Sequence, residues 1–222
     1  MKPPIVSSTE PITLIGGAKV AHSVLTEALR YAPKVVCADG GADTALSAGL
    51  TVEAVIGDMD SASAAAKTAY GAVLHPIAEQ NSTDFDKCLR NIEAPAILGV
   101  GFLGDRVDHT LAVLHVLQKY RRPIVLLGAD DLVFMVPDQV RFDAVLGQRV
   151  SLMPVTDSIV TSRGLKWEVT DAPMSMRDFI GSSNEATAQV VEVRATPGMA
   201  VIMPPEALGS VWAELTGGVP AR

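Results

Sequence analysis

Two apolar runs of strand type end abruptly in acidic residues and glycine, and this feature constrains the fold more than any other. Residues 34–38 lead into Asp39, and residues 52–56 lead into Gly57 and Asp58. In an α/β sheet this pattern places the acids at the carboxyl edge of the strands, where ligands bind. Because carboxylates brought so close repel one another, we expect a hard cation such as Mg²⁺ to hold them, with a phosphate behind it.

Strand-type and helical segments alternate through the first half of the chain. The expected strands are residues 12–15, 34–38, 53–56, 72–75, 96–100 and 123–127. The expected helices are residues 18–31, 42–48, 62–70, 83–92 and 106–120. Strands interleaved with helices in this way predict an α/β fold with a doubly wound, mostly parallel sheet and helices on both faces.

The pattern changes near residue 137. Short β-branched segments follow, separated by Gly, Pro, Asp and Asn: residues 141–146, 149–153, 158–162, 165–169, 189–194, 200–203 and 211–215. They predict an all-β sandwich or barrel, and hence two domains, 1–137 and 138–222. The intervening loop 171–185 is long for a compact β domain, and loops of that length are more often functional.

Charge and cysteine usage exclude several classes of protein. The net charge of -7 and the pI near 5.0 argue against a nucleic-acid partner, since such binding rests on Lys and Arg. Cys37 and Cys88 are expected to be small buried hydrophobes, which fits a reducing cytoplasm. No run of 18 apolar residues occurs, so we expect no membrane span.

The acids after the strands are the first candidate site. Asp58 and Asp60 are two residues apart in a turn, so both can face one cation if the backbone bends. The same segment is also ordinary turn chemistry, with Ser61 as the N-cap of the next helix. Asp39 is followed by Gly40-Gly41, which lets the backbone approach a ligand. Three acids at strand ends favour a metal or phosphate site.

The helix expected after residue 82 carries further charges. Asp84 lies in its first turn, with Thr83 or Ser82 near the cap, and the helix dipole alone favours a carboxylate there. We expect Asp86 and Lys87 on other faces of the helix. Lys87 then either reaches a phosphate or is solvated.

Residues 99–104 match G-x-G-x-x-G, follow a strand and open a helix. This suggests a dinucleotide-binding oxidoreductase, but it lies in the fifth β-α unit instead of the first, and the pattern alone is a weak signal. Arg106 and Asp108, at the start of the next helix, suit a phosphate and a metal or hydroxyl. The alternative is a surface ion pair between them. His109 is placed to touch the same site.

The β region has one candidate of its own. Trp167 follows a Gly turn, and such a residue is either core or a flat partner for an aromatic or cationic ligand. Residues 182–185 close the long loop with hydrogen-bonding groups.

Together these segments resemble the thiamine pyrophosphokinase family. The resemblance is carried, in order, by Asp39-Gly40-Gly41-Ala42, Gly57-Asp58-Met59-Asp60-Ser61, Gln80-x-x-Thr83-Asp84, Gly104-Asp105-Arg106-Val107-Asp108-His109, Gly164-Leu165-Lys166-Trp167 and Ser183-Asn184-Glu185. The combination spans both expected domains. The family usually has Gly where Asp105 stands and Phe where Met59 stands, and Asp105 is expected to alter the loop near the phosphates.

The resemblance implies an ATP- and Mg²⁺-binding α/β domain, a thiamine-binding β-sandwich, and a homodimer with thiamine at the subunit interface. It implies pyrophosphoryl transfer from ATP to thiamine. The implied metal ligands are Asp58, Asp60 and Asp84. The implied catalytic residues are these three with Asp39, Arg106 and Asp108. The implied ATP-binding residues are Asp39, Gly40, Gly41, Gln80, Lys87 and Arg106. The implied thiamine-binding residues are Trp167, Ser183 and Asn184.

Three other functions remain open on the sequence alone. One is pyrophosphoryl transfer to another hydroxymethyl heterocycle, such as a pterin. The second is the NAD-dependent oxidoreductase suggested by residues 99–104, and the third is a non-catalytic nucleotide sensor.

Overall fold

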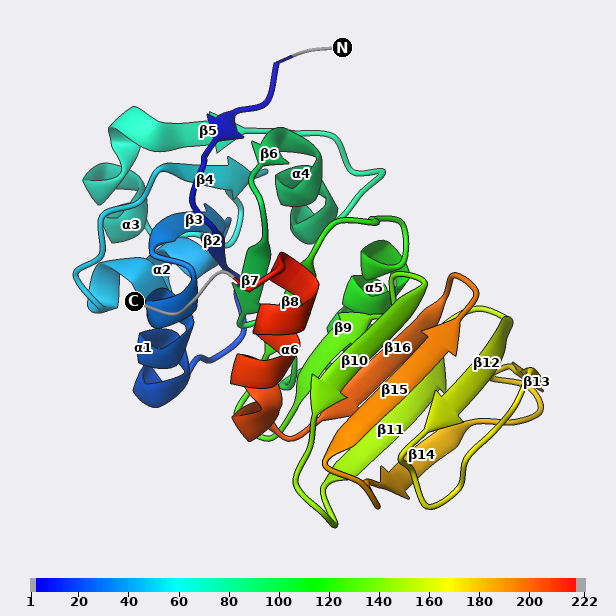
Figure 1. Cartoon of the computed structure of the whole chain (residues 1–222). Coiled ribbons are helices and arrows are strands. Elements are labelled where there is room, and N and C mark those ends of the chain that lie inside the picture. The colour runs from blue at the N-terminus through cyan, green and yellow to red at the C-terminus, as the bar shows by residue number, and fades with distance from the viewer. Residues whose placement is uncertain (1–2, 219–222) are drawn as a thin grey trace. The chain divides into compact units, whose positions relative to one another are not determined.

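The computed structural model describes residues 3–218, which divide into two compact units (Figure 1). The first unit contains residues 3–116 and 126–129, and the second contains residues 117–125 and 130–218. The domain boundary that we expect at residue 137 remains a prediction. Within the described residues, no helix combines the length and apolar character that crossing a bilayer requires.

The first unit is built on a parallel sheet. Its strands are β2 (Ile12–Ile15), β3 (Lys34–Ala38), β4 (Ala54–Gly57), β5 (Leu74–Pro76), β7 (Ile97–Val100) and β8 (Ile124–Leu127), of which β8 passes from one unit to the other. β2 pairs with β7, β3 with β4 and β4 with β5, all in parallel, and β3 packs beside β2. Every residue of β2, β4 and β7 is buried, as expected for strands covered on both faces.

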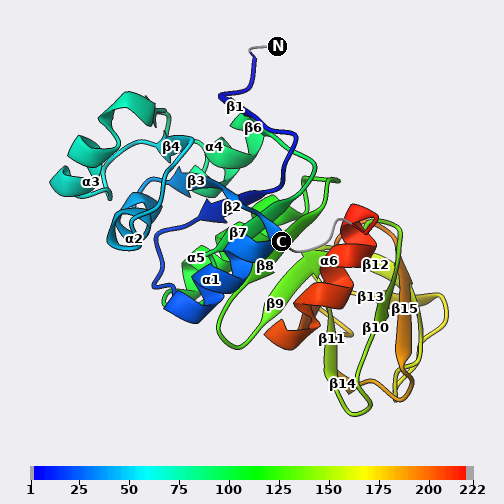
Figure 2. The same ribbon diagram turned by 60° about the vertical axis from the view of Figure 1, so that its left-hand side comes forward.

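Five helices connect these strands: α1 (His22–Tyr31), α2 (Gly41–Ser47), α3 (Ala64–Ala69), α4 (Asp84–Asn91) and α5 (Val107–Leu117). A short 3-10 turn, η1 (Gly71–Val73), precedes β5. Helices α1 to α3 lie on one face of the sheet, and α4 and α5 lie on the other (Figures 1 and 2). The predicted doubly wound fold is thereby confirmed. A further pair of short strands, β1 (Val6–Ser7) and β6 (Ile92–Glu93), is parallel and was not expected.

Two details of the helices differ from expectation. Ser63, and not Ser61, caps α3, because its side chain accepts a hydrogen bond from the Ala66 N–H. Helix α1 begins at His22 instead of residue 18, and the segment before it is held against the loop after β7, where the Ala18 N–H donates to the Gly101 carbonyl. Thr83 caps α4, as expected, by accepting from the Asp86 N–H.

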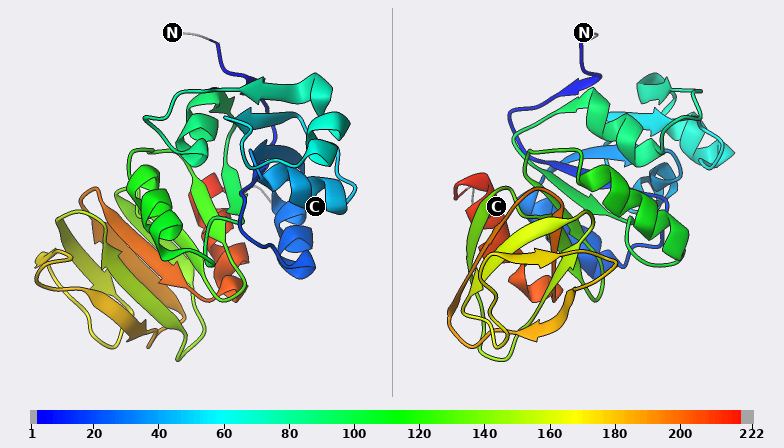
Figure 3. Two further views of the ribbon diagram at one scale, coloured as in Figure 1. Left: turned by 180° about the vertical axis from the view of Figure 1, so that it is seen from behind. Right: turned by 90° about the vertical axis from the view of Figure 1, so that its right-hand side faces the viewer.

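The second unit contains two antiparallel sheets. Their strands are β9 (Leu132–Met135), β10 (Gln139–Asp143), β11 (Arg149–Pro154), β12 (Ser158–Arg163), β13 (Ala172–Met174), β14 (Gly181–Glu185), β15 (Val190–Ala195) and β16 (Met199–Met203). Four of these strands follow one another in the order β14-β11-β16-β9, and the other four in the order β10-β15-β12-β13. Figure 3 shows the strands of this unit from two further sides. Phe134 and Phe142 are buried and meet edge to face at 6.3 Å between their ring centroids. The predicted β-rich C-terminal region is confirmed.

The strand expected at residues 211–215 is wrong. These residues belong to helix α6 (Leu208–Thr216), which follows a 3-10 turn, η2 (Pro205–Ala207). Leu208, Val211 and Trp212 are buried, which is the spacing of one helical face, whereas the short apolar run alone also fits a strand. Helix α6 packs alongside β10, where Ser210 Oγ accepts the Asp143 N–H at 2.6 Å.

The expected strand at residues 165–169 is also wrong, since these residues form a turn. Gly164 begins this turn with a φ of +79°, a conformation that favours glycine, and Glu168 Oε1 accepts the Gly164 N–H. The segment 171–185, which we expected to be a loop, contains β13 and β14. The strand of β14 is polar, so its sequence lacks the apolar alternation that marks a strand.

Candidate functional site

A cavity of about 850 Å³ lies at the carboxyl ends of the strands in the first unit. Gly17 follows β2, Asp39 follows β3, Asp58 follows β4 and Gly101 follows β7, and all four residues line it. This is the edge of a doubly wound sheet at which ligands bind. The lining also includes residues of α4 and α5.

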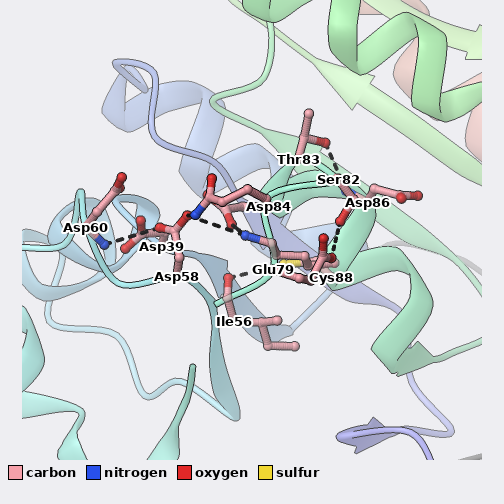
Figure 4. A network of polar contacts seen from close by, with 12 residues as sticks. Asp39, Ile56, Asp58, Asp60, Glu79, Ser82, Thr83, Asp84, Asp86 and Cys88 are labelled. Carbon is pink, nitrogen blue, oxygen red and sulfur yellow. Dashed lines mark hydrogen bonds and ion pairs between the residues drawn. The ribbon is translucent and has the colours of Figure 1, made fainter. Parts of the chain in front are cut away.

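Three carboxylates gather at this edge (Figure 4). One oxygen from each of Asp39, Asp58 and Asp60 lies within 4.8 Å of the others. Asp39 is 2% exposed, whereas Asp60 is exposed to solvent. Hard carboxylate oxygens at this spacing are the donor set that Mg²⁺ takes in proteins.

Asp39 is held in place by the backbone after β4. Its two carboxylate oxygens accept the N–H groups of Ser61 and Ala62, both at 3.0 Å. Burial raises the pKa of the Asp39 carboxyl, and the charge of Asp84 adds to this rise, while the two backbone bonds oppose it. The backbone at Asp39 has a φ of +40°, which a non-glycine residue rarely adopts.

Gly57 allows the neighbouring acids to approach. A Cβ atom at this position would lie 2.7 Å from Asp39 Cβ and 3.1 Å from Asp84 Oδ1. Because Gly57 has no side chain, Asp84 can lie beside this group, although it is not one of the three acids whose oxygens lie within 4.8 Å of one another. We call Asp39, Asp58, Asp60 and Asp84 together the acidic rim. The structure thus places the four expected acids along one edge.

Asp58 accepts bonds from two chemically different side chains. Gln80 Nε2 donates to its Oδ2 at 3.0 Å, and Lys87 Nζ lies 3.5 Å from the same oxygen. These bonds lower the pKa of Asp58, with Gln80 as the largest cause, so the carboxylate is kept ionised. The side-chain amide of Gln80 therefore binds Asp58 in this structure.

Lys87 is buried, with a side chain that is 2% exposed, so the solvated alternative is wrong. Its Nζ donates to Asp84 at 2.9 Å, so the expectation that the two residues lie on different faces of α4 is also wrong. A contact of Lys87 with a phosphate remains a prediction. Burial opposes its charge, but the bonds to Asp84 and Asp58 outweigh this and raise the pKa of Lys87. One ammonium group thus neutralises part of the acidic rim.

Arg106 and Asp108 form an exposed ion pair. Arg106 Nη2 donates to Asp108 Oδ2 at 2.6 Å, which raises the pKa of Arg106 and lowers that of Asp108. Arg106 lines the cavity together with His109. The structure therefore agrees with the alternative that Arg106 and Asp108 form a surface ion pair. Their roles in binding ATP remain predictions.

Sequence reasoning missed two charged residues of the cavity lining, Lys19 and Asp43. Asp43 Oδ2 accepts the Ser63 N–H at 2.9 Å. Lys19 follows the glycine turn after the first strand, and that position next to a strand end was the signal available in the sequence.

The predicted thiamine-binding residues lie in the second unit. Trp167 is 58% exposed, so the expectation of a core residue is wrong, and the Lys166 ammonium lies 4.9 Å from the centroid of its ring. A small cavity of about 140 Å³ is lined by Trp167, Asn184 and neighbouring apolar side chains. Ser183 is exposed and has a φ of +57°.

Asn184 is buried, and its amide is engaged within the protein. Its Oδ1 accepts the N–H groups of Trp167 and Glu185, and its Nδ2 donates to the Trp167 carbonyl at 2.9 Å. The structure therefore gives Asn184 a role in holding Trp167, and direct contact with a ligand remains a prediction.

Two family models match the chain. The one described as "Thiamin pyrophosphokinase, catalytic domain" matches residues 25–126. The one described as "Thiamin pyrophosphokinase, vitamin B1 binding domain" matches residues 138–200. The first match contains the acidic rim, and the second contains Trp167 and Asn184.

Known relatives and solved structures agree with these matches. "Thiamine pyrophosphokinase 2" of Oryza sativa subsp. japonica is 28% identical over 221 residues, which covers 80% of this chain and 83% of that protein. "Thiamin pyrophosphokinase 1" of Caenorhabditis elegans is 28% identical over 65% of this chain and 67% of that protein. The fold is similar to that of thiamin pyrophosphokinase from Candida albicans, with a TM-score of 0.74, 16% identity, and coverage of 92% of this chain and 95% of that one.

The order of the motifs, the acidic rim and these matches over both parts of the chain lead to one assignment. The protein belongs to the thiamin pyrophosphokinase family, a family of kinase-type enzymes.

Proposed function

We propose that this protein transfers the pyrophosphoryl group of ATP to the hydroxyethyl oxygen of thiamine, giving thiamine diphosphate and AMP. The observation that carries the proposal is the gathering of Asp39, Asp58 and Asp60 at a cavity in the part of the chain that matches the catalytic domain. Such a transfer needs the triphosphate charge neutralised and the reacting oxygens held in line.

The donor set at this edge fits a divalent cation. Asp58, Asp60 and Asp84 would hold Mg²⁺, with Asp39 as the fourth acid of the rim. Bound there, Mg²⁺ would offset the negative charge of the triphosphate and position its oxygens. The bonds that Asp39 takes from Ser61 and Ala62 fix the loop that carries Asp58 and Asp60, so the ligands are preorganised before any ion arrives.

The remaining residues of the cavity would bind and orient ATP. Gly40, which lines the cavity, would let the backbone approach the nucleotide, with Gly41 as the next residue. Gln80 and Lys87 lie next to Asp58 in the same lining. Arg106 would offer a planar fork to a phosphate in exchange for its exposed bond with Asp108. An exposed ion pair is weak, so a phosphate can displace it at little cost.

Thiamine would bind through the second part of the chain. The exposed indole face of Trp167 complements a cationic aromatic ring, and Ser183 and Asn184 border the same turn. We further propose two domains, an ATP- and Mg²⁺-binding domain of residues 1–137 and a thiamine-binding and dimerisation domain of residues 138–222. The matches to residues 25–126 and 138–200 support this division.

We propose a homodimer with thiamine bound at the subunit interface. Exposed apolar side chains support this proposal, because Trp167, Met176, Phe179 and Ile180 are 40% to 63% exposed in the isolated chain. A cytoplasmic location is also proposed. Both Cys37 and Cys88 are buried free thiols, and burial raises the pKa of Cys37 to about 12, so they are suited to a reducing compartment.

Incubation of the protein with ATP, Mg²⁺ and thiamine, followed by chromatography, tests the reaction. We expect AMP and thiamine diphosphate in equal amounts, and no AMP when thiamine is omitted. A hydroxymethyl pterin in place of thiamine tests the alternative acceptor, and NAD⁺ with an alcohol tests the oxidoreductase. Failure to form AMP at any protein or thiamine concentration would overturn the proposal.

A further inference from the structure

Two loops meet where the strand order of the first unit reverses. Strand β2 lies between β3 and β7, and the loops that follow β2 and β7 border the crevice at this point. The Ala18 N–H donates to the Gly101 carbonyl at 3.0 Å, and the Lys19 N–H donates to Asp105 Oδ2 at 2.9 Å. In open α/β sheets a ligand binds at this reversal.

The two loops are in close contact and lie next to the acidic rim. Cβ atoms added to Gly16 and Gly101 would each approach the other residue's carbonyl oxygen, at 2.5 Å and 2.7 Å. A Cβ atom at Gly40 would lie 3.8 Å from Gly17 Cα, so the loop after β2 touches the turn that follows Asp39. Lys19 is therefore held near the carboxylates without being bonded to them.

Asp105 has a left-handed backbone conformation, which is unusual for a residue other than glycine. Its φ is +51° and that of Gly104 is +93°, so two successive residues are left-handed. Glycine would adopt this conformation at position 105 without strain. What the aspartate adds is its carboxylate, and that carboxylate accepts the Lys19 N–H.

The lysine and arginine side chains that line the cavity are not equally available. Lys87 is paired with Asp84 and Asp58, and Arg106 is paired with Asp108. Lys19 is exposed, lines the cavity, and has no ion pair with any of residues 3–218. It is thus the lining ammonium group that can meet an anionic ligand without first leaving a carboxylate.

We propose that Lys19 binds the triphosphate of the nucleotide, and that Asp105 is a positioning residue that holds Lys19 through its backbone N–H. This inference rests on the proposed use of ATP. An ammonium group offers a compact charge with three donors to phosphate oxygens. Fixing the main chain beneath it reduces the freedom that would otherwise be lost on binding.

The first test compares Lys19→Ala with Lys119→Ala. Both variants lose one exposed positive charge, but Lys119 is not among the residues that line the cavity. We expect Lys19→Ala to raise KM for ATP about tenfold, the size of one charged hydrogen bond, and to change kcat and KM for thiamine by less than about twofold. We expect no such rise for Lys119→Ala. Equal KM values for ATP in the two variants would overturn the role of Lys19.

The second test uses Asp105→Gly and Asp105→Asn. Glycine keeps the left-handed backbone but removes the acceptor, whereas asparagine keeps an acceptor oxygen and tolerates this conformation. We expect Asp105→Gly to raise KM for ATP about threefold, and Asp105→Asn to recover most of that loss. Because Asp105 acts through Lys19, adding Asp105→Gly to Lys19→Ala should not raise KM for ATP any further. If Asp105→Gly raised KM for ATP by the same factor in the wild type and in Lys19→Ala, the positioning role would be refuted.

Calorimetric titration with Mg²⁺ and ATP separates this inference from the proposed reaction. If the wild-type protein binds ATP but forms no AMP, the proposed reaction fails while Lys19→Ala should still weaken ATP binding about tenfold. If Lys19→Ala binds ATP as tightly as the wild type, or the wild type does not bind ATP, the inference fails.

Discussion

The side-chain amide of Asn184 bonds to both the N–H and the carbonyl of Trp167, so one buried residue fixes the backbone that presents an exposed indole. Asn184 is 4% exposed, whereas Trp167 is 58% exposed. The main chain that carries the ring is therefore held by polar contacts and not by burial of the ring itself.

Asn184→Ala should weaken thiamine binding without changing the chemistry. The change leaves the N–H and carbonyl of Trp167 and the N–H of Glu185 without this partner, at a cost of about 1–3 kcal/mol. We expect KM for thiamine to rise about tenfold and kcat to be largely kept. Asn184→Asp retains the acceptor oxygen, so its KM for thiamine should lie between those of the wild type and Asn184→Ala. Steady-state kinetics with saturating ATP measures this, and an unchanged KM for thiamine would contradict it.

Asp58→Asn and Asp60→Asn should each lower turnover by about a thousandfold, since a lost metal ligand removes several kcal/mol of charge stabilisation. Folding should be kept, because both positions are near the surface and Asn is isosteric with Asp. The matched control is Asp157→Asn, at an exposed residue of the second unit. Single-turnover assays and circular dichroism measure the two effects. Activity like that of the wild type in either rim variant would remove the proposed metal site.

Lys87→Met should destabilise the fold at neutral pH. It removes the partner of Asp58 and Asp84, whose side chains are 15% and 30% exposed, so solvent screening limits the expected loss to about 2 kcal/mol. The pKa of Asp58 is lowered in the folded state, so the stabilisation is present above its unfolded pKa and is lost as pH falls through the folded pKa. We therefore expect the free energy of unfolding of Lys87→Met, measured with urea, to differ less from that of the wild type at pH 3 than at pH 7. The same difference in unfolding free energy at both pH values would contradict this account.

Glu79 should titrate far below an ordinary glutamate. Ser82 and Arg90 both donate to its carboxylate, in that order of effect, and they lower its pKa from 4.5 to about 2. The sign of the shift means that the contact stabilises the fold above pH 4.5 and is lost as pH falls toward 2. A carbon-detected NMR titration of the carboxyl group measures this. Arg90→Ala should move the midpoint upward, and an unchanged midpoint would exclude Arg90 as a cause.

Gly41→Ala should be far more damaging than Gly71→Ala. A Cβ atom at Gly41 would lie 2.1 Å from the Ile15 carbonyl oxygen, and a backbone atom cannot move aside as a side chain can. At Gly71 nothing lies within 4 Å of the added atom. We expect Gly41→Ala to lower the free energy of unfolding by about 3 kcal/mol or to prevent folding. Thermal unfolding of both variants checks this, and similar midpoints would contradict it.

The sequence predicted the site correctly where a local pattern also determines where a residue lies in the fold. Asp39 and Asp58 follow apolar strands, and parallel strands bring their ends to one edge, so their proximity could be expected before the structure was known. The helix at Val211 was missed because five apolar and polar residues fit either period, and only packing against β10 decides between them.

The site was predicted least well where a contact joins distant segments. Lys87 pairs with Asp84 three residues earlier, but its second partner, Asp58, lies 29 residues earlier, and the local spacing does not reveal that contact. The backbone of Trp167 is likewise held by bonds with Asn184, which lies 17 residues later in the chain. The bond from Lys19 to Asp105 spans 86 residues and uses a backbone donor, which no residue pattern records.

Helix α6 also limits how two copies of this chain can associate. Its Ser210 and Glu214 side chains occupy the N–H groups of Asp143 and Arg141, which are the groups that β10 would offer to an added strand. Edge strands whose N–H groups are left unpaired tend to recruit strands from other chains. A second copy therefore cannot extend this sheet at β10 unless α6 first moves away from that strand.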